Sequence, residues 1–170
     1  MHVMEDAVFE LFSQRARQVI FLARLKAGQR GAQTIEIEDL LAGYIIEDRG
    51  EFEKAISDLF PNGNPVKQVG ARSHRSFLSP DLASDLLASL QALCTQSHPV
   101  PNQSDLPLSN GANGILRLAN SLREELKQTS VEPLHFLAAI LEDESSRGAQ
   151  IFREAGITRE KVIQFLREST

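Results

Sequence analysis

The stretch Thr34–Asp48 reads TIEIEDLLAGYIIED, and it returns 96 positions later as SVEPLHFLAAILEDE at Ser130–Glu144. Self-similarity over such a length indicates a duplicated structural unit. Two copies are too few for a solenoid, so we expect a pseudo-symmetric pair of repeats that share one hydrophobic core. Without any gap, the same offset aligns further identical residues: Ser13 with Ser109, Ala16 with Ala112, Leu22 with Leu118, Leu41 with Leu137 and Val66 with Val162.

Composition and charge restrict the class of protein. With 170 residues, 42% hydrophobic and 24% charged, the chain fits one globular domain or two small halves packed together. A formal net charge of -5 and the lack of any Lys/Arg run argue against a nucleic-acid binder. No apolar stretch suggests a membrane span or a signal peptide. The single cysteine, Cys94, excludes an internal disulfide framework, so we expect a cytoplasmic protein.

Helix signals recur in the same order in both copies. In the first copy, Ser13 is a good N-cap, and a second helix follows with Glu38 and Asp39 in its first turn. Apolar spacing predicts a third helix over residues 52–60 and a short fourth helix near residues 65–69. The stretch TIEIE alternates as a strand would, but the proline in its copy argues against a strand at both positions.

The second copy has clearer boundaries. Ser109 can cap its first helix. Pro133 is expected to be the first residue of the second helix, since the N–H that proline lacks would have no partner within the helix at that position. Gly156 closes the third helix and Thr158 caps the fourth.

The segment between the copies matches neither of them. Ser79-Pro80-Asp81 starts a helix with an apolar stripe, which either packs into the core or docks a partner. We therefore expect a monomeric, all-α protein of two four-helix repeats, with the first repeat over residues 10–70 and the second over residues 109–169. Residues 71–108 form an insertion with one extra helix. The stripe consists of Leu82, Leu86, Leu87, Leu90 and Leu93.

No motif for nucleotide, cofactor or metal chemistry is present. The sequence has no phosphate-binding loop, no dinucleotide fingerprint and no zinc motif, and no nucleophile–base–orienter set is visible. We predict that the protein is not an enzyme and binds no cofactor or metal. The scattered candidate metal ligands are His2, His74, Cys94, His98 and His135.

Three stretches resemble the duplicated N-terminal domain of the Clp unfoldases, the AAA+ chaperones that feed substrates to proteases or dissolve aggregates. Phe12–Ala16 (FSQRA) looks like the family's F-[ST]-x-R-A opening. Ile35–Leu41 (IEIEDLL) looks like its I-G-T-E-H-[IL]-L segment, with Val131–Leu137 as the second copy. Ile151–Ile157 (IFREAGI) looks like its I-L-x-x-x-G-[IV] close. The resemblance implies an all-helical docking platform for substrates and adaptor proteins.

The resemblance also points to a site at the first turn of the second helix in each repeat. The family's Thr-Glu pair, which in some relatives helps bind phosphorylated arginine, is Ile37-Glu38 here and Pro133-Leu134 in the second copy, so at most one half-site remains. We expect protein partners to dock near Glu38, Asp39, Leu134 and His135. The alternative is that Asp39 and Glu38 only stabilise their helix, and that His135 is a capping histidine.

The function implied is a non-enzymatic protein-binding module. It would recruit substrates or adaptors to an AAA+ unfoldase or protease, or regulate one, with a Clp ATPase or protease subunit among its partners. The first copy should prefer basic segments and the second apolar ones, with a modest pH dependence if His135 titrates near 6.5. An alternative is a small-molecule or signal sensor that uses the groove between the repeats.

Overall fold

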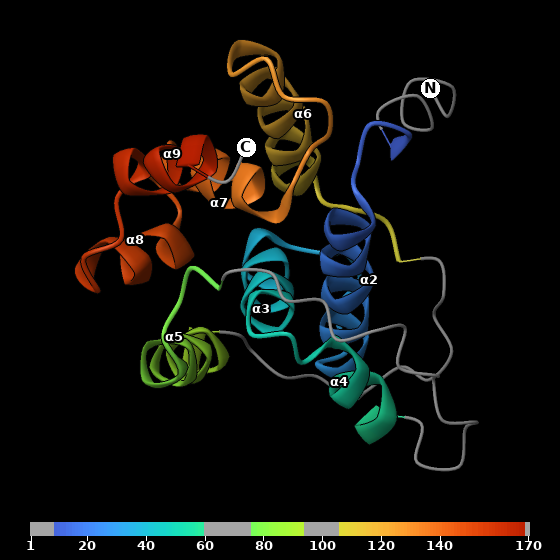
Figure 1. Cartoon of the computed structure of the whole chain (residues 1–170). Helices are drawn as coiled ribbons and strands as arrows, with labels where there is room; N and C mark the ends of the chain where they lie inside the picture. The colour runs from blue at the N-terminus through green and yellow to red at the C-terminus, as the bar shows by residue number, and fades with distance from the viewer. Residues whose placement is uncertain (1–8, 60–75, 94–105, 169–170) are drawn as a thin grey trace.

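A computed structural model describes residues 9–59, 76–93 and 106–168, and over these residues it contains eight α-helices and no strand (Figure 1). The predicted all-α fold is confirmed. Within these residues no helix is both long and apolar enough to cross a bilayer. The helices are α2 (Gln14–Gln29), α3 (Ile37–Asp48), α4 (Phe52–Leu59), α5 (Pro80–Leu93), α6 (Asn110–Glu125), α7 (Pro133–Leu141), α8 (Arg147–Glu154) and α9 (Arg159–Glu168).

The first helices of the two copies have the same bounds at the 96-residue offset. Both α2 and α6 are 16 residues long. Ser13 accepts the Ala16 N–H and Ser109 accepts the Ala112 N–H, each at 3.1 Å, so both serines cap as the sequence predicts. The helices α3 and α7 also begin at equivalent residues, and Pro133 is the first residue of α7.

Two isolated parallel β-bridges join the halves. Phe12 pairs with Val131, and Ile35 pairs with Leu108. At the 96-residue offset Phe12 corresponds to Leu108 and Ile35 to Val131, so the two bridges join equivalent pairs of residues. Ser13, which follows Phe12, donates its N–H to the Val131 carbonyl, and Ser109, which follows Leu108, donates its N–H to the Ile35 carbonyl, each at 3.0 Å. In each half, the segments that precede the first two helices therefore pair with the other half. The alternating stretch TIEIE forms one isolated bridge, at Ile35, and not a strand.

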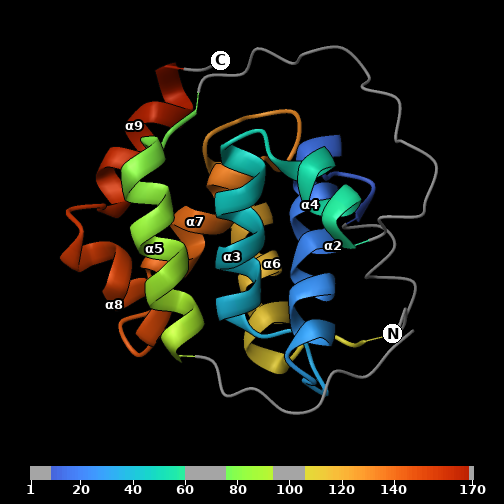
Figure 2. The ribbon, with the colours of Figure 1, turned by 90° about the horizontal axis from the view of Figure 1, so that it is seen from below.

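The core lies around α3 and α7, which pack against each other and are buried over most of their length. Figure 2 shows α3 in the middle of the molecule, with α5 on one side and α2 with α4 on the other. Burial of each large apolar side chain contributes roughly 1.5–3 kcal/mol. One continuous cluster includes residues of both halves, among them Leu40, Leu41, Tyr44, Ile45, Phe136, Leu137, Ile140 and Phe152.

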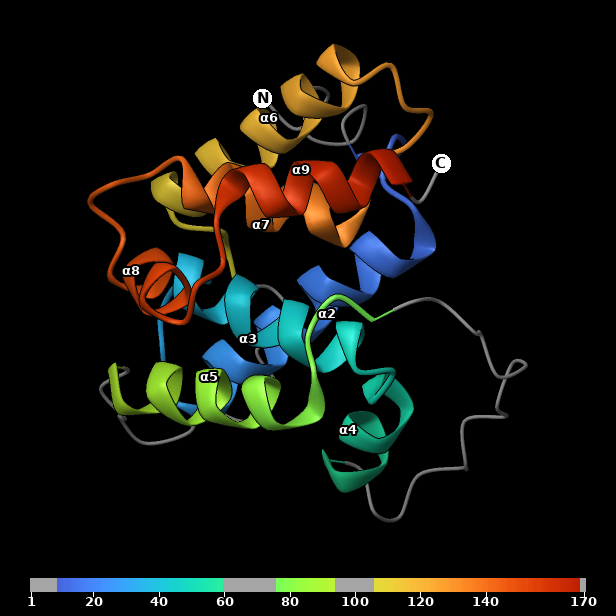
Figure 3. The ribbon, with the colours of Figure 1, turned by 60° about the vertical axis from the view of Figure 1, so that its left-hand side comes forward.

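The helix α5 is part of this core. It packs against α3 as α9 packs against α7, and it also contacts α8 of the other half (Figure 3). Leu86 and Leu90 are buried. At the 96-residue offset the counterpart of α9 would span residues 63–72, which lie outside the described residues together with the helix expected near 65–69. By its packing, α5 takes the position in the first half that α9 takes in the second.

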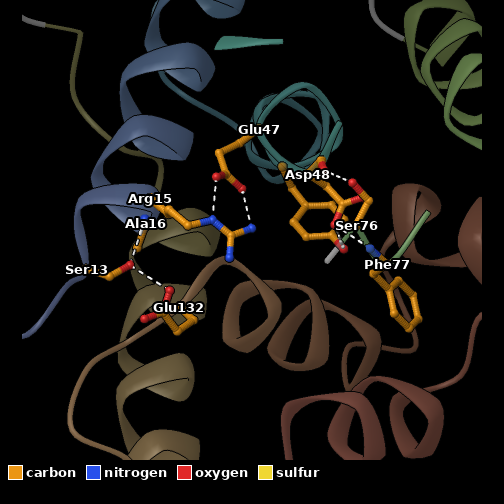
Figure 4. Close-up of polar contacts among 9 residues, drawn as sticks. Ser13, Arg15, Ala16, Glu47, Asp48, Ser76, Phe77 and Glu132 are labelled. Carbon is orange, nitrogen blue, oxygen red and sulfur yellow. Dashed lines mark hydrogen bonds and ion pairs between the residues drawn. The ribbon is translucent and has the colours of Figure 1, made fainter. Parts of the chain in front are cut away.

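The segment before α5 is fixed to the end of α3. The Asp48 carboxylate accepts the N–H groups of Phe77 and Leu78, each at 2.9 Å, and the Ser76 hydroxyl donates to the Asp48 carbonyl at 2.7 Å (Figure 4). The Phe77 ring meets the Phe165 ring of α9 edge to face, with centroids 5.2 Å apart. These contacts set the start of α5 between the two halves.

Candidate functional site

Asp39 is a buried helix cap with only 2% of its surface exposed. Its carboxylate accepts the N–H of Glu36, the N-cap residue of α3, at 2.9 Å. Arg30, directly after α2, donates two hydrogen bonds of 2.6 and 2.9 Å to the same carboxylate. Such a bidentate pair fixes both side chains. Asp39 therefore joins the start of α3 to the end of α2 and is turned away from solvent.

His135 has the same position in the second half and is 0% exposed. Its Nδ1 accepts the Glu132 N–H at 2.8 Å, so Nε2 carries the proton and donates to the Gln128 side chain. Burial lowers the pKa of His135 to about 4, and the charge of Arg123 acts in the same direction. The expectation that this histidine titrates near 6.5 is therefore wrong.

Glu38 and Leu134 are half-buried. Leu134 packs against the core cluster. Glu38 makes no hydrogen bond or ion pair with the residues that the structure describes, and it lines a cavity of about 210 Å³ between α2, α3 and α5. We call this cavity the Glu38 groove. Its lining comprises Lys26, Gln29, Arg30, Glu38, Asp39, Ala42, Leu87, Leu90 and Gln91.

The Glu38 groove combines free charges with an apolar wall. Lys26 on α2, like Glu38 on α3, has no ion-pair partner among the described residues, whereas the charge of Arg30 is matched by Asp39. Gln29 and Gln91 add amide groups, which can donate and accept hydrogen bonds. This arrangement can hold a polar or charged segment of a partner against the side of α5.

A second cavity of about 270 Å³ adjoins the first and shares Lys26, Gln29 and Leu87 with it. It lies along α4, and we call it the α4 groove. Its lining comprises Leu22, Leu25, Lys26, Gln29, Ile46, Glu51, Lys54, Ala55, Asp58 and Leu87.

A further polar cluster is structural. Arg15 holds the buried carboxylate of Glu47 through bonds of 2.6 and 3.0 Å, and the Ser13 hydroxyl donates to Glu132 of the other half at 2.9 Å (Figure 4). These residues face the interior between the halves. They connect α2 to α3 and to the N-cap residue of α7.

The four predicted site residues thus fall into two kinds. Asp39 and His135 lie inside with separate partners and Leu134 packs against the core cluster, while Glu38 faces an open groove. Leu87 and Gln91 of α5 form one side of that groove. The only sequence signal for them was the leucine stripe, for which docking of a partner was one of two interpretations. Over the described residues no cluster of three histidine, cysteine, aspartate or glutamate side chains could hold a metal ion. His2, His74, Cys94 and His98 lie outside those residues.

Comparisons with known proteins agree with this architecture. The family model described as the Clp repeat (R) N-terminal domain matches residues 79–170, more than half of the chain. No curated protein matches.

Three solved structures share the fold. One comes from structural investigations of a malarial protein secretion system; it is 20% identical with a TM-score of 0.67, and the match covers 93% of each chain. Another is the N-terminal domain of the caseinolytic protease associated chaperone ClpD from Arabidopsis thaliana, 15% identical with a TM-score of 0.64, covering 93% of this chain and 99% of that one. A third is the Hsp104 N-terminal domain from Candida albicans, 21% identical with a TM-score of 0.60, covering 94% and 93%.

Proposed function

Since this chain belongs to the family of Clp repeat N-terminal domains, we propose that it is a non-enzymatic protein-binding module that recruits substrates or adaptors to an AAA+ unfoldase, or regulates one. Domains of this family bind substrates and adaptors of AAA+ chaperones. The partners of this chain are then protein segments, with a Clp ATPase or protease subunit among them.

The observation that carries the proposal is the contrast between Glu38 and its neighbour. The Asp39 carboxylate is bound by the Glu36 N–H and by Arg30, whereas Glu38, one position earlier, has no partner among the described residues and lines a groove. A half-buried free carboxylate is worth more to a basic partner than a fully solvated one, because the lower local dielectric strengthens the pairing. Glu38 therefore selects basic segments, and Leu87 supplies apolar contact.

In the experiment, the wild-type chain and the Glu38→Gln variant are each immobilised. The amount of the Clp ATPase from the same genome that each of them retains is then measured. We expect retention to fall several-fold, most clearly at low salt, with an unchanged melting temperature. Glu125→Gln, at an exposed position of α6, is the matched control. Equal retention by wild type and Glu38→Gln would remove Glu38 from the docking surface.

A second candidate is a small-molecule sensor in the Glu38 groove. Lys26 and Glu38, which have no ion-pair partner among the described residues, place a cation and a carboxylate in the same cavity, which suits a zwitterionic ligand such as an amino acid. Calorimetry of the chain with a panel of amino acids tests this function. Saturable binding that disappears in both Lys26→Met and Glu38→Gln would favour the sensor.

A further inference from the structure

We propose that Gly148 of α8 is a positioning residue of the Glu38 groove. Because it has no side chain, the second half can hold Glu38 and Leu90 in the places where they line the groove. This inference rests on the proposed function and adds a residue of the other half to the same site. Its evidence is the close approach of α8 to α3 and α5, and the different residue at the equivalent position of α4.

The first turn of α8 lies directly against the core. Gly148 is the second residue of α8, and a Cβ built on it would lie only 2.5 Å from Leu41 Cδ1. Leu41 is 0% exposed, so its side chain is enclosed by other core residues and cannot move into solvent. The Ser146 hydroxyl accepts the Ala149 N–H at 3.2 Å, which fixes this turn. Glycine weakens a helix relative to alanine, but here it permits the close packing of α8 on α3.

Two lining residues of the Glu38 groove are neighbours of Gly148. The same Cβ would lie 3.6 Å from Leu90 Cδ2 and 3.7 Å from Glu38 Cγ, which are ordinary van der Waals distances. Leu90 comes from α5 and Glu38 from α3, and α8 contacts both helices (Figure 3). Gly148 does not itself line the groove. It lies behind two of the lining side chains, so the place of α8 decides where the stem of Glu38 and the end of Leu90 can lie.

The equivalent residue of the first half has a different role. At the 96-residue offset Gly148 corresponds to Phe52, whose ring meets Phe21 of α2 with centroids 6.1 Å apart. A large side chain at this position thus packs on the preceding helix of its own half, whereas the glycine lets α8 reach α3 of the other half. Glu38 likewise corresponds to Leu134, which packs against the core cluster. The contact of α8 with Glu38 is therefore a feature of this pair of residues and not of the repeat.

A single methyl group at Gly148 should change the shape of the groove and leave its charge intact. The methyl group must displace Leu41 or move α8, because the site is closely packed. Either movement reaches Leu90 and Glu38, which lie beside the added group. Gly148→Ala should therefore weaken partner binding but keep its dependence on salt, whereas Glu38→Gln removes the charge and with it part of that dependence.

The first measurement follows the groove without any partner. The 170-residue chain has no tryptophan, so Gln91→Trp, at a lining position beside Leu90, gives a fluorescence signal from the groove alone. Adding Gly148→Ala should move this emission to longer wavelength and raise its quenching by acrylamide, because Leu90 loses its close packing. The control is Val162→Ala, at a buried position of α9, which packs against α7. It should lower the melting temperature and leave the emission unchanged.

The second measurement is retention of the Clp ATPase by immobilised chains without the tryptophan. Gly148→Ala should lower retention several-fold. In the double variant with Glu38→Gln, the loss should be smaller than the product of the two single losses, since both substitutions act on one groove. Adding Leu41→Val to Gly148→Ala removes the methyl group that the new Cβ would meet, so it should restore part of the retention and of the emission.

Unchanged emission in Gly148→Ala, or losses of retention that multiply in the double variant, would overturn the proposal. A defect that Leu41→Val leaves in place, including a failure of Gly148→Ala to fold in a melting experiment, would overturn it as well. Equal retention by wild type and Glu38→Gln is the failure of the proposed function. In that case the emission still decides whether Gly148 positions Leu90, so either idea can fail alone.

Discussion

Asp39 and His135 occupy equivalent positions in the two halves: each accepts the N–H of the glutamate that caps its helix, Glu36 at 2.9 Å and Glu132 at 2.8 Å. The first half uses a charged cap, and Arg30 neutralises it. The second half uses a neutral imidazole. One backbone requirement is thus met by two different chemistries, which have different responses to pH and to substitution.

The His135 cap makes stability depend on pH. Its folded pKa of about 4 lies below the value of about 6.5 expected in the unfolded chain, so the unfolded state binds more protons between these values. The contribution is complete above pH 6.5 and is lost as pH falls towards 4, at a cost of about 3 kcal/mol. Urea denaturation at several pH values measures it.

The control is His135→Gln, because glutamine is accepted at this position of a capping box and does not titrate. The variant should lose most of the decline in stability between pH 6.5 and 4. An identical decline in both proteins would assign the effect to other groups.

Breaking the Arg30–Asp39 ion pair should lower the stability of the protein strongly, and two further substitutions should restore part of that stability. Arg30→Leu leaves Asp39 buried without its cation and should cost about 3 kcal/mol of unfolding free energy. Leucine is also the residue at the equivalent position of the second half, Leu126. Adding Asp39→His and Ala32→Gln installs the whole second-half set, since Ala32 corresponds to Gln128. Chemical denaturation should show the triple variant to be more stable than Arg30→Leu, and no recovery would contradict the equivalence.

A strained residue in the second half offers a stabilising change. Lys127 has φ of 57°, and its counterpart in the first half is Gly31, with φ of 73°. A residue with a side chain costs about 1–2 kcal/mol in this left-handed region. Glycine removes this cost, but it also raises the conformational entropy of the unfolded chain, which offsets part of the gain. Lys127→Gly should therefore raise stability by about 0.5–1 kcal/mol, measured as a higher melting temperature. Lys127→Ala, which keeps the strain, is the control and should show no gain.

Gly43 marks the closest approach of α2 and α3. A Cβ at this position would lie 2.5 Å from the Val19 carbonyl oxygen, so backbone must move to admit it. Gly43→Ala should cost about 1–3 kcal/mol through overpacking. The equivalent residue is Ala139, which is buried without such a conflict, so Ala139→Gly should cost only about 1 kcal/mol. Equal effects of the two substitutions in denaturation would show that α2 and α3 can separate freely.

The duplicated sequence predicted most of the fold for a physical reason. Residues at the 96-residue offset must satisfy the same backbone, so Ser13 and Ser109 both cap and Pro133 begins its helix. The offset did not predict the place of α5, because pairing of Val66 with Val162 points to another segment, while packing against α3 depends on tertiary contacts. Only the structure shows which helix lies against α3.

The site was predicted in part. Glu36 stands three residues before Asp39, which is the spacing of a capping box, and this signal identifies Asp39 as an interior cap. Glu38 and Asp39 look alike as sequence, but adjacent helical residues point about 100° apart, so they meet different neighbours. Asp39 is held by Arg30 and by the Glu36 N–H, whereas Glu38 makes no hydrogen bond or ion pair with the described residues. The α4 groove is lined by residues of α2, α3, α4 and α5 together, and periodicity within single helices cannot show such a juxtaposition.

The crossed bridges of Phe12 with Val131 and of Ile35 with Leu108 have a consequence for assembly. A chain with only one half leaves both of its bridge segments unpaired, and the surface that completes them is a second copy related by a two-fold axis. An isolated half should therefore form an isologous dimer. Two fragments that end at Leu93 and begin at Leu106 should likewise reassociate when mixed, as a split protein does, without any covalent link between them.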